Sequence, residues 1–183
     1  MTKQAAASNI IKTSASLFNK QGYKATSISA ITKALGLTKG AIYRHFKNKS
    51  ALEAEALKYM CISIEVGLGS KIMAKKHVEE KMEAIFKFFE EYASNLYYES
   101  GCPLLNAAVE VDDTNPELKK VVHKIILNIH GGIVRVLENG KKHGQLKQDV
   151  DSDAFASMVF TSVEGAIMVT KVTDDPKHMR VVI

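Results

Sequence analysis

Apolar residues recur at intervals of three and four positions along nearly all of this 183-residue chain, the spacing of one face of an α-helix. Gly, Pro, Ser, Thr and Asn divide the pattern into segments of helical length, with "GLGS" at 67–70 as an expected break. No segment alternates as a half-buried strand does, so the pattern predicts an all-α fold without internal repeats. The predicted helices cover residues 3–21, 28–35, 39–46, 50–66, 77–98, 103–111, 116–140 and 153–172.

Two of the predicted helices, residues 28–35 and 39–46, are short and follow each other closely. Thr26 or Ser27 can cap the first of them, and Gly36 can end it. Thr38 is a good N-cap for the second. Two short helices joined by three or four residues that include a glycine are typical of a helix-turn-helix.

The second short helix has two unlike faces when its residues are placed at 100° intervals. Ile42 and Phe46 form an apolar stripe that is expected to pack inward. Gly40 and Arg44 lie opposite that stripe, and Tyr43 lies on one flank. This helix is therefore expected to dock through its stripe and to present a cation, an aromatic hydroxyl and a small residue to a polyanion.

The charges are unevenly distributed along the chain. Residues 1–52 contain nine Lys and Arg residues and no Asp or Glu, whereas the rest contains 16 basic and 20 acidic residues. Such asymmetry indicates contact with nucleic acid or with an anionic membrane, unless the basic face is merely solvated. The charges of the first predicted helix, Lys3, Lys12 and Lys20, are too sparse for a polybasic membrane anchor. Nucleic acid is the favoured partner, and no membrane is expected.

Motifs of the common enzyme classes are missing from the sequence. The chain has no P-loop, no GxGxxG and no nucleophile elbow. A metal site could be imagined from Asp112, Asp113, His123 and His130, but these residues lack an HExxH-type spacing. The sequence therefore predicts no catalytic activity, no cofactor and no metal.

The cysteine usage and the hydropathy pattern favour a protein of the cytoplasm. Cys61 and Cys102 form no metal-spacing motif and predict two free thiols in a reducing compartment. The amino-terminal segment has no apolar region followed by a cleavage site, so secretion is not expected. No uninterrupted apolar run reaches the roughly 20 residues of a membrane span.

The motifs "GYKATSISAI" and "LGLTKGAIYRHFKNKSAL" follow a first helix that carries "II" and "LF". In this order and spacing, residues 10–52 resemble the DNA-binding region of the tetracycline-repressor (TetR) family of bacterial transcription regulators. The segments "GCPLLNAAVEVDDTNPEL" and "SVEGAIMVTKV" are more loosely similar to parts of that family's carboxyl-terminal domain. The resemblance implies a helix-turn-helix domain over residues 1–50 and a larger helical ligand-binding and dimerisation domain over residues 51–183.

The resemblance also implies two kinds of contact with double-stranded DNA. The residues that it places near bases and neighbouring backbone in the major groove are Thr38, Lys39, Gly40 and Tyr43. The residues that it places on phosphates are Thr26, Ser27, Tyr43, His45 and Lys49. Arg44 occupies a variable position and is assigned equally to a phosphate or a base contact. His45 and Tyr43 could instead be packing residues.

For the remainder of the chain, the resemblance implies a repressor that binds a pseudo-palindromic operator as a homodimer and is released by a small-molecule effector. Predicted helices 116–140 and 153–172 are apolar on more than one face. Pairing with their symmetry mates in a four-helix interface would bury these faces, and burial within one subunit is the alternative.

An apolar effector cavity is predicted in the carboxyl-terminal domain. Its candidate lining residues are Met60, Phe86, Phe89, Tyr92, Cys102, Asn106, Phe160, Glu164 and Met168. Taken individually, most of them fit a plain core role better than a ligand contact. Glu164 is the most informative, because an isolated carboxylate in an apolar segment is costly without a partner. A cationic ligand, a basic side chain or the rim of the dimer could provide one.

Overall fold

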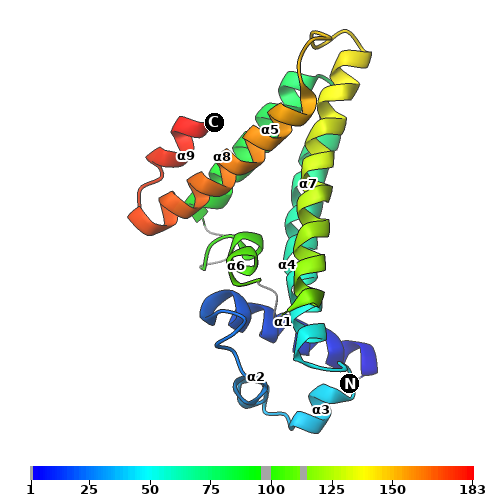
Figure 1. Ribbon diagram of the computed structural model, residues 1–183, viewed down its shortest axis with the longest axis vertical. Helices are drawn as coiled ribbons and strands as arrows, with labels where there is room; N and C mark the ends of the chain where they lie inside the picture. The colour runs from blue at the N-terminus through cyan, green and yellow to red at the C-terminus, as the bar shows by residue number, and fades with distance from the viewer. Residues whose placement is uncertain (1, 96–99, 112–114) are drawn as a thin grey trace. The chain divides into compact units, whose positions relative to one another are not determined.

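The computed structural model describes residues 2–95, 100–111 and 115–183, and within these ranges the chain is helical with no strand (Figure 1). The predicted all-α fold is confirmed. The helices are α1 Lys3–Gln21, α2 Ile28–Leu35, α3 Lys39–Tyr43, α4 Lys49–Met73, α5 Val78–Asn95, α6 Pro103–Glu110, α7 Pro116–Lys142, α8 Ser152–Thr173 and α9 Lys177–Val182. The expected last residues of the helix predicted over 77–98 lie outside the described residues, as do Asp112 and Asp113.

The chain divides into two compact units. The first unit comprises Met1–Ser63 and Pro103–His123, and the second comprises Ile64–Cys102 and Lys124–Ile183. Helices α4 and α7 each contribute to both units. The two units are compact regions of the structure. The predicted division near residue 50 into a DNA-binding domain and a ligand-binding domain stays a prediction.

Caps at both ends explain why α2 and α3 form where the sequence predicts them. Ser27 accepts a hydrogen bond from the Ala30 amide at the start of α2, and Gly36 ends that helix in the left-handed region with φ of 65°. Thr38 accepts a hydrogen bond from the Ala41 amide and so caps α3. A side-chain oxygen at this position satisfies an amide that has no partner within the helix.

The predicted helices differ from the observed ones in three places. Helix α3 ends at Tyr43 rather than at residue 46, although the Phe46 amide still donates to the Ile42 carbonyl at 3.1 Å. The predicted break at 67–70 does not exist, and α4 runs through it to Met73. Helix α9 was not predicted, because its six residues are too few to show a helical period.

Packing against α5 explains why α4 continues across its glycines. A Cβ added to Gly67 would be in ordinary van der Waals contact with the Phe88 ring, at 3.5 Å, whereas one added to Gly69 would meet open space. The hydroxyl of Ser70 donates to the Gly67 carbonyl at 2.8 Å and adds a local bond. Each glycine lowers helix propensity by about 1 kcal/mol relative to alanine, and such tertiary packing routinely overrides that cost.

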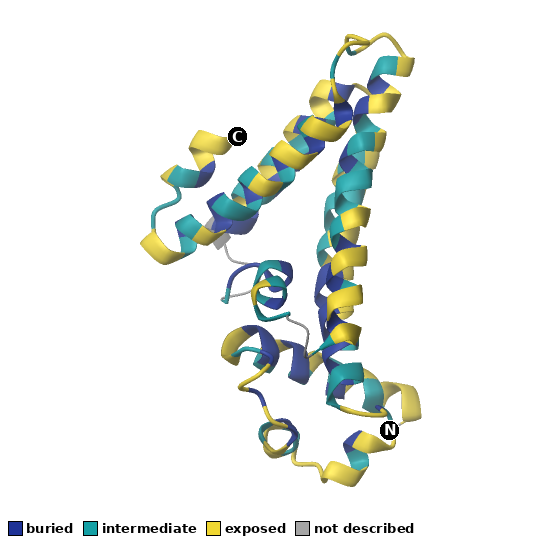
Figure 2. Ribbon diagram, viewed as in Figure 1, coloured by how far each residue is buried: buried dark blue, intermediate teal, exposed yellow. Residues whose placement is uncertain are grey.

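Each unit has its own buried core (Figure 2). In the first unit, the rings of Phe18 and Tyr23 stack with centroids 5.1 Å apart. The predicted inward packing of Ile42 and Phe46 is confirmed, since their exposed fractions are 0% and 7%. Leu37, in the turn between α2 and α3, is 39% exposed. The core of the second unit includes Ile85, Phe88, Tyr92, Val159, Val163, Ile167 and Met179.

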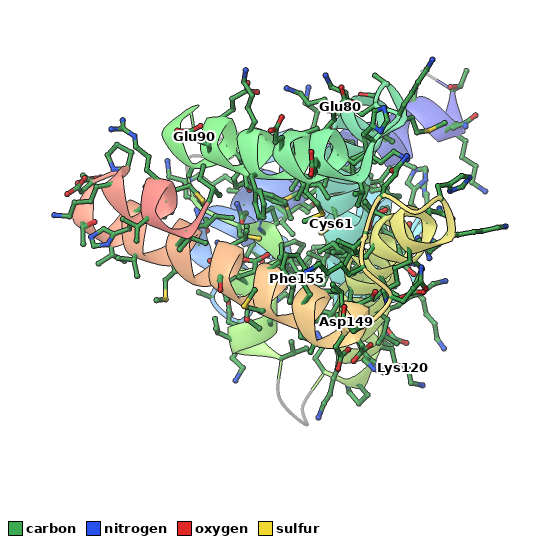
Figure 3. The ribbon with its side chains drawn as sticks, turned by 90° about the horizontal axis from the view of Figure 1, so that it is seen from above. Cys61, Glu80, Glu90, Lys120, Asp149 and Phe155 are labelled. Atoms are coloured by element: carbon green, nitrogen blue, oxygen red, sulfur yellow. The ribbon has the colours of Figure 1, made fainter. Side chains whose placement is uncertain are left out.

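Two contacts fix the amino-terminal end of α5. The Glu80 carboxylate, labelled in Figure 3, accepts hydrogen bonds from the amides of Lys76 and His77. These bonds hold the pKa of Glu80 below its ordinary value. Nearby, Gly140 of α7 packs so closely on Val78 that a Cβ there would lie 2.9 Å from the valine side chain. The start of α5 is thus held against α7 by a position that only glycine fills.

Candidate nucleic-acid interface and ligand cleft

The outward side of α3 carries the residues that the sequence assigns to a major groove. Thr38, Lys39, Gly40 and Arg44 are exposed, and the ring of Tyr43 is 49% exposed. Ile42, on the opposite side of the helix, is fully buried and attaches α3 to the first unit. The arrangement therefore presents polar and basic side chains on a helix that is anchored from behind, as docking against a duplex requires.

Gly40 leaves open space on that surface. A Cβ added to Gly40 would meet nothing nearer than the Thr38 hydroxyl oxygen, at 3.9 Å. The glycine is therefore not needed for packing within the protein. Its absence of a side chain allows another molecule to approach the backbone of α3.

In the connector between α1 and α2, the neighbouring residues Ser27 and Thr26 have different surroundings. Ser27 is exposed, and its oxygen caps α2 while its hydroxyl hydrogen stays available to a phosphate. Thr26 is fully buried, and its hydroxyl donates to the Gly22 carbonyl at 2.7 Å. The predicted phosphate contact of Thr26 does not fit this geometry, because its side chain closes the connector from inside.

Lys49 makes several contacts within the fold, while its predicted phosphate contact stays a prediction. Its ammonium group donates to the Tyr23 carbonyl at 2.5 Å and pairs with the Glu53 carboxylate at 3.2 Å. The same nitrogen lies 5.9 Å from the centre of the Phe18 ring. These contacts bind Lys49 to the fold of the first unit.

His45 and Lys47 also belong to this basic segment. His45 is half-buried, and its ring centroid lies 6.3 Å from that of Phe46, so both a phosphate contact and a packing role stay open for it. Lys47 is exposed directly after α3, and the sequence-based assignment omitted it. Its place in the turn between two anchored helices could have indicated it.

Helix α6 holds the connector from the other side. The two Glu110 oxygens accept hydrogen bonds from the amides of Tyr23 and Lys24, each at 3.0 Å. Gly22 has a φ of 89°, and a Cβ there would lie 2.8 Å from a Glu110 oxygen. The connector therefore adopts a conformation that only glycine accepts easily, and one carboxylate fixes it.

A second polar contact joins α6 to α1. The Asn106 side-chain amide donates to the side-chain oxygen of Asn19 at 2.9 Å. Asn106 was predicted to line the effector cavity, and the structure instead places it in this contact within the first unit.

A buried carboxylate links α4 to the start of α7. Glu53 is 4% exposed, pairs with Lys49 and accepts a bond from the Asn115 side chain at 2.6 Å. Burial raises the pKa of Glu53, although Lys49 and Asn115 oppose that effect. The Asn115 oxygen also accepts from the Leu118 amide and so caps α7.

The second unit contains an open cleft of about 760 Å³ between the later part of α4, helix α5 and helix α7. Its volume lies within the usual range of small-molecule sites. Most of its wall is aliphatic, and Phe89 is the predicted cavity residue found there. The lining residues are Glu65, Leu68, Gly69, Ile72, Met73, Lys75, Lys81, Ile85, Phe89, Asn128, Ile129, Gly132, Ile133, Arg135, Val136 and Asn139.

The other predicted cavity residues lie elsewhere. Met60 is fully buried in the first unit, and Tyr92 is buried against Phe88 and Phe89. Phe86 and Phe160 are half-buried, and Met168 is 50% exposed on α8. Helical periodicity identified their apolar character but not the neighbours that each would meet.

Two predicted cavity residues, Cys102 and Glu164, do meet in the second unit. The Cys102 thiol donates to one Glu164 oxygen at 3.3 Å, while the other oxygen is buried without a hydrogen-bond partner among the described residues. Burial raises the pKa of Glu164 above its ordinary value of 4.5, and the bond from Cys102 only partly offsets this rise. The carboxyl group is therefore stabilised in its protonated form.

We expect Glu164→Gln to remove part of the pH dependence of stability. A folded-state pKa above the unfolded value means that the folded protein holds the proton more tightly, so this stabilisation is complete below about 4.5 and is lost as pH rises through the folded-state pKa. The free energy of unfolding of the wild type should therefore fall, relative to Glu164→Gln, across that interval. Urea unfolding of both proteins at several pH values measures the difference, and parallel curves would contradict the assignment.

Helix α8 carries an exposed stripe of small and apolar residues, and α7 exposes one large apolar residue. On α8 the exposed side chains of Met158, Thr161 and Met168 follow heptad-like spacing, and Gly165 between them has no heavy atom within 4 Å of an added Cβ. On α7, Leu127 is 56% exposed. Near these residues the His130 ring nitrogen approaches the Ser157 hydroxyl at 3.0 Å, which joins the two helices.

The length and apolar composition of α8 also match those of a membrane span. Among the described helices, α8 is the one that is long enough and apolar enough to cross a membrane. This criterion concerns length and composition only. The exposed Asp153 interrupts its apolar surface, and the half-buried Glu164 adds a second carboxyl group. The described residues contain no group of three or more His, Cys, Asp or Glu side chains placed to hold a metal ion.

Comparisons with known proteins agree with this geometry. The family described as "Bacterial regulatory proteins, tetR family" matches residues 10–56, and "Tetracyclin repressor-like, C-terminal domain" matches residues 78–183. A TetR transcriptional regulator from Chloroflexus aurantiacus has a similar solved structure, with a TM-score of 0.91 and 32% identity over 98% of this chain and 90% of that one. A regulator from Cytophaga hutchinsonii aligns with a TM-score of 0.86 and 29% identity over 100% and 92% of the two chains. The HTH-type transcriptional regulator TtgR of Pseudomonas putida is 27% identical over 86% of this chain and 76% of its own length.

Proposed function

Because the chain belongs to the TetR family of DNA-binding transcriptional regulators, we propose that it is a ligand-responsive repressor that binds a pseudo-palindromic operator as a homodimer. The observation that carries this proposal is the exposed polar and basic side of α3, anchored from behind by buried Ile42. It would act in the cytoplasm, where its DNA is. An effector bound in the second unit would release it from the operator.

The proposed interface uses seven of the nine predicted residues. Ser27, Thr38, Lys39, Gly40, Tyr43, Arg44 and His45 are kept, and Lys47 is added because it is exposed in the same basic segment. Phosphate contacts fix the register of such a helix, and the few side chains near its start can reach base edges. Thr26 and Lys49 act behind this surface by holding the connector and α4 in place.

We expect Gly40→Ala to weaken operator binding without harming the fold. The added methyl group meets open space in the free protein, and alanine favours a helix by up to about 1 kcal/mol over glycine. Against DNA the same methyl would hold the backbone away, so the affinity should fall about tenfold or more, that is by about 1.4 kcal/mol. Gly69→Ala in α4, where the added Cβ also meets open space, is the matched control. Unchanged DNA affinity in Gly40→Ala would remove Gly40 from the interface.

In the proposed dimer, the exposed stripe of α8 and the exposed apolar surface of α7 pack against the same helices of the second subunit. Exposed apolar residues at heptad-like spacing are suited to a helix-helix seam, and a seam between identical subunits is self-complementary. The same seam accounts for the apolar character of α8 without a membrane. A two-fold dimer would set two recognition helices roughly 34–36 Å apart, or at another near-integral number of helical turns, to match two half-sites.

Release by an effector requires only that the effector bind one of two conformations more tightly. A ligand that favours a conformation with unsuitable half-site spacing would lower operator affinity by its ratio of affinities for the two states. No new contact with DNA is needed for this effect.

Selection of genomic fragments by the purified protein tests the proposal. We expect recovery of fragments that share a pseudo-palindrome, binding that weakens with salt, and release by a small molecule in a subsequent screen. Sedimentation with anionic liposomes, run in parallel, tests the alternative that the basic segment binds a membrane surface. Binding to liposomes together with no sequence preference among fragments would overturn the proposal.

A further inference from the structure

The two ends of the cleft in the second unit differ in charge. Glu65 lies at one end of the wall that α4 forms, and Lys75 lies just beyond the other end. The two residues are ten positions apart, which at the rise of a helix is roughly 15 Å. Between them the α4 wall is formed by Leu68, Gly69, Ile72 and Met73, and Phe89 lies opposite on α5. On α7 the lining is mixed, with Asn128, Arg135 and Asn139 among aliphatic residues. The cleft thus offers an apolar wall with charged groups beside it, as a site for an elongated amphipathic molecule would.

The basic end continues into a second, smaller hollow of about 240 Å³. Lys81, Val136 and Asn139 line both spaces, so the two adjoin. The complete lining of the hollow is Lys76, Val78, Lys81, Val136, Asn139, Gly140, His143 and Gln145. No acidic side chain is among these residues, whereas two lysines are. The hollow is therefore a polar, electropositive terminus of the cleft.

Two cations of the cleft, Lys81 at this end and Arg135 beside Gly131 and Gly132, are available to a ligand. Neither Lys81 nor Arg135 forms an ion pair with any residue that the structure describes. Lys81 is half-buried beside apolar wall, where an ammonium group without a counter-charge is unfavourable and an incoming anion would be favoured.

The glycine pair of α7 makes room for the second cation. The Arg135 guanidinium nitrogens lie 3.5 Å and 3.8 Å from the positions that a Cβ would take on Gly131 and Gly132. Arg135 therefore folds back along α7 over backbone that carries no side chains, which places its charge at the cleft lining. Helix α7 is unbroken at these glycines, and the arginine side chain lies on it.

Glu65 does not reverse the charge of the site. It is a single carboxyl group, three helical turns from Lys75, against the three cations Lys75, Lys81 and Arg135. Burial raises the pKa of Glu65, which makes its negative charge easier to neutralise.

From these observations we infer that the cleft binds an amphipathic organic anion, with its apolar body along α4, α5 and α7 and its carboxylate or phosphate-type head group at Lys81 and the adjoining hollow. This inference rests on the proposed function, because it names the chemical class of the effector. A cationic amphiphile is disfavoured in this orientation, because its head group would lie beside Lys81.

Calorimetric titration of the full-length protein, without DNA, tests the inference directly. The probes are hexanoate, octanoate, decanoate and dodecanoate below their micelle concentrations, with matched alkyl phosphates, alcohols and trimethylammonium salts. Each added methylene should raise the affinity about fourfold until the cleft is filled. Carboxylates or phosphates should bind at least tenfold more tightly than alcohols of equal length. The comparison of these two anions identifies the preferred head group.

Two variants place the binding in this site. Lys81→Gln should lower the affinity for the anions at least tenfold and leave that for the alcohols unchanged. Gly69→Leu should abolish binding of all probes, because its side chain would extend from an open position of the lining and leucine favours the helix. Ser70→Leu, one residue along on the exposed face of α4, is the control and should bind normally.

The outcomes separate this inference from the proposed function. Equal binding of all head groups, preference for trimethylammonium salts, full binding by Gly69→Leu, or no binding of any probe would each overturn the inference. Fragment selection with the ligand-free wild type is independent of all of them. Failure of that selection would overturn the proposed function, while a successful selection without probe binding would overturn only the inference.

Discussion

Gly165→Glu should convert the protein from a dimer to a monomer and lower its affinity for a two-half-site operator by about a hundredfold or more. The affinity loss follows because linking two half-site contacts in one dimer raises overall affinity by about 10²–10⁴ over a single contact. Gly165 lies within the exposed stripe of α8, and an added Cβ meets no atom within 4 Å. The new side chain therefore begins in open space in the single subunit, and circular dichroism of the variant checks that the subunit still folds.

The two-fold symmetry of the proposed dimer makes this substitution severe. In a self-complementary interface each contact occurs twice, so two new carboxylates would be pressed into the apolar surface of the mate and removed from water. Sedimentation equilibrium measures the dimerisation, and gel shifts measure the operator affinity. Val66→Glu adds the same charge at a 67% exposed position of α4 and should leave both unchanged. A Gly165→Glu protein that stays dimeric would show that α8 does not form the interface.

Local signals in the sequence predicted the helix-turn-helix almost residue by residue. The bounds of α2 follow from Ser27 and Gly36, whose roles as caps depend on side-chain chemistry and backbone freedom within a few residues. The inward face of α3 follows from the four-residue spacing of Ile42 and Phe46. These features are predictable because their causes lie within one helical turn of the residues concerned.

The features that the sequence did not predict have causes that are distant along the chain. Thr26 is buried because the connector folds over it, and Asn106 contacts Asn19, 87 residues earlier. Helical periodicity shows which face of a helix is apolar but not which helix covers it, so most predicted cavity residues lie outside the cleft. Lys49 is a partial exception, since Glu53 four residues later is a recognisable ion-pair spacing on a helix.

Glu110→Gln should destabilise the first unit by about 2 kcal/mol, because a carboxylate that accepts backbone hydrogen bonds contributes about 1.5–3 kcal/mol for each such bond. Both oxygens of Glu110 accept bonds, from the Tyr23 and Lys24 amides. Glutamine keeps one oxygen and would turn its amide hydrogens toward the second donor. Urea unfolding followed by circular dichroism measures the loss. Glu83→Gln, at an exposed position of α5, is the matched control and should have almost no effect.

Combining this site with Gly22 separates contact from backbone strain. Gly22→Ala alone should lower the free energy of unfolding for two reasons. The backbone at residue 22 has a φ of 89°, and the added Cβ would lie 2.8 Å from the Glu110 carboxylate. In a Glu110→Ala background the second effect vanishes and only the backbone strain, about 1–3 kcal/mol, remains. The double-mutant cycle should therefore show that the two substitutions together cost less than the sum of their separate effects. Additive effects would mean that Glu110 does not press on the connector. In that case α6 would not set the position of the connector from which α2 and α3 extend.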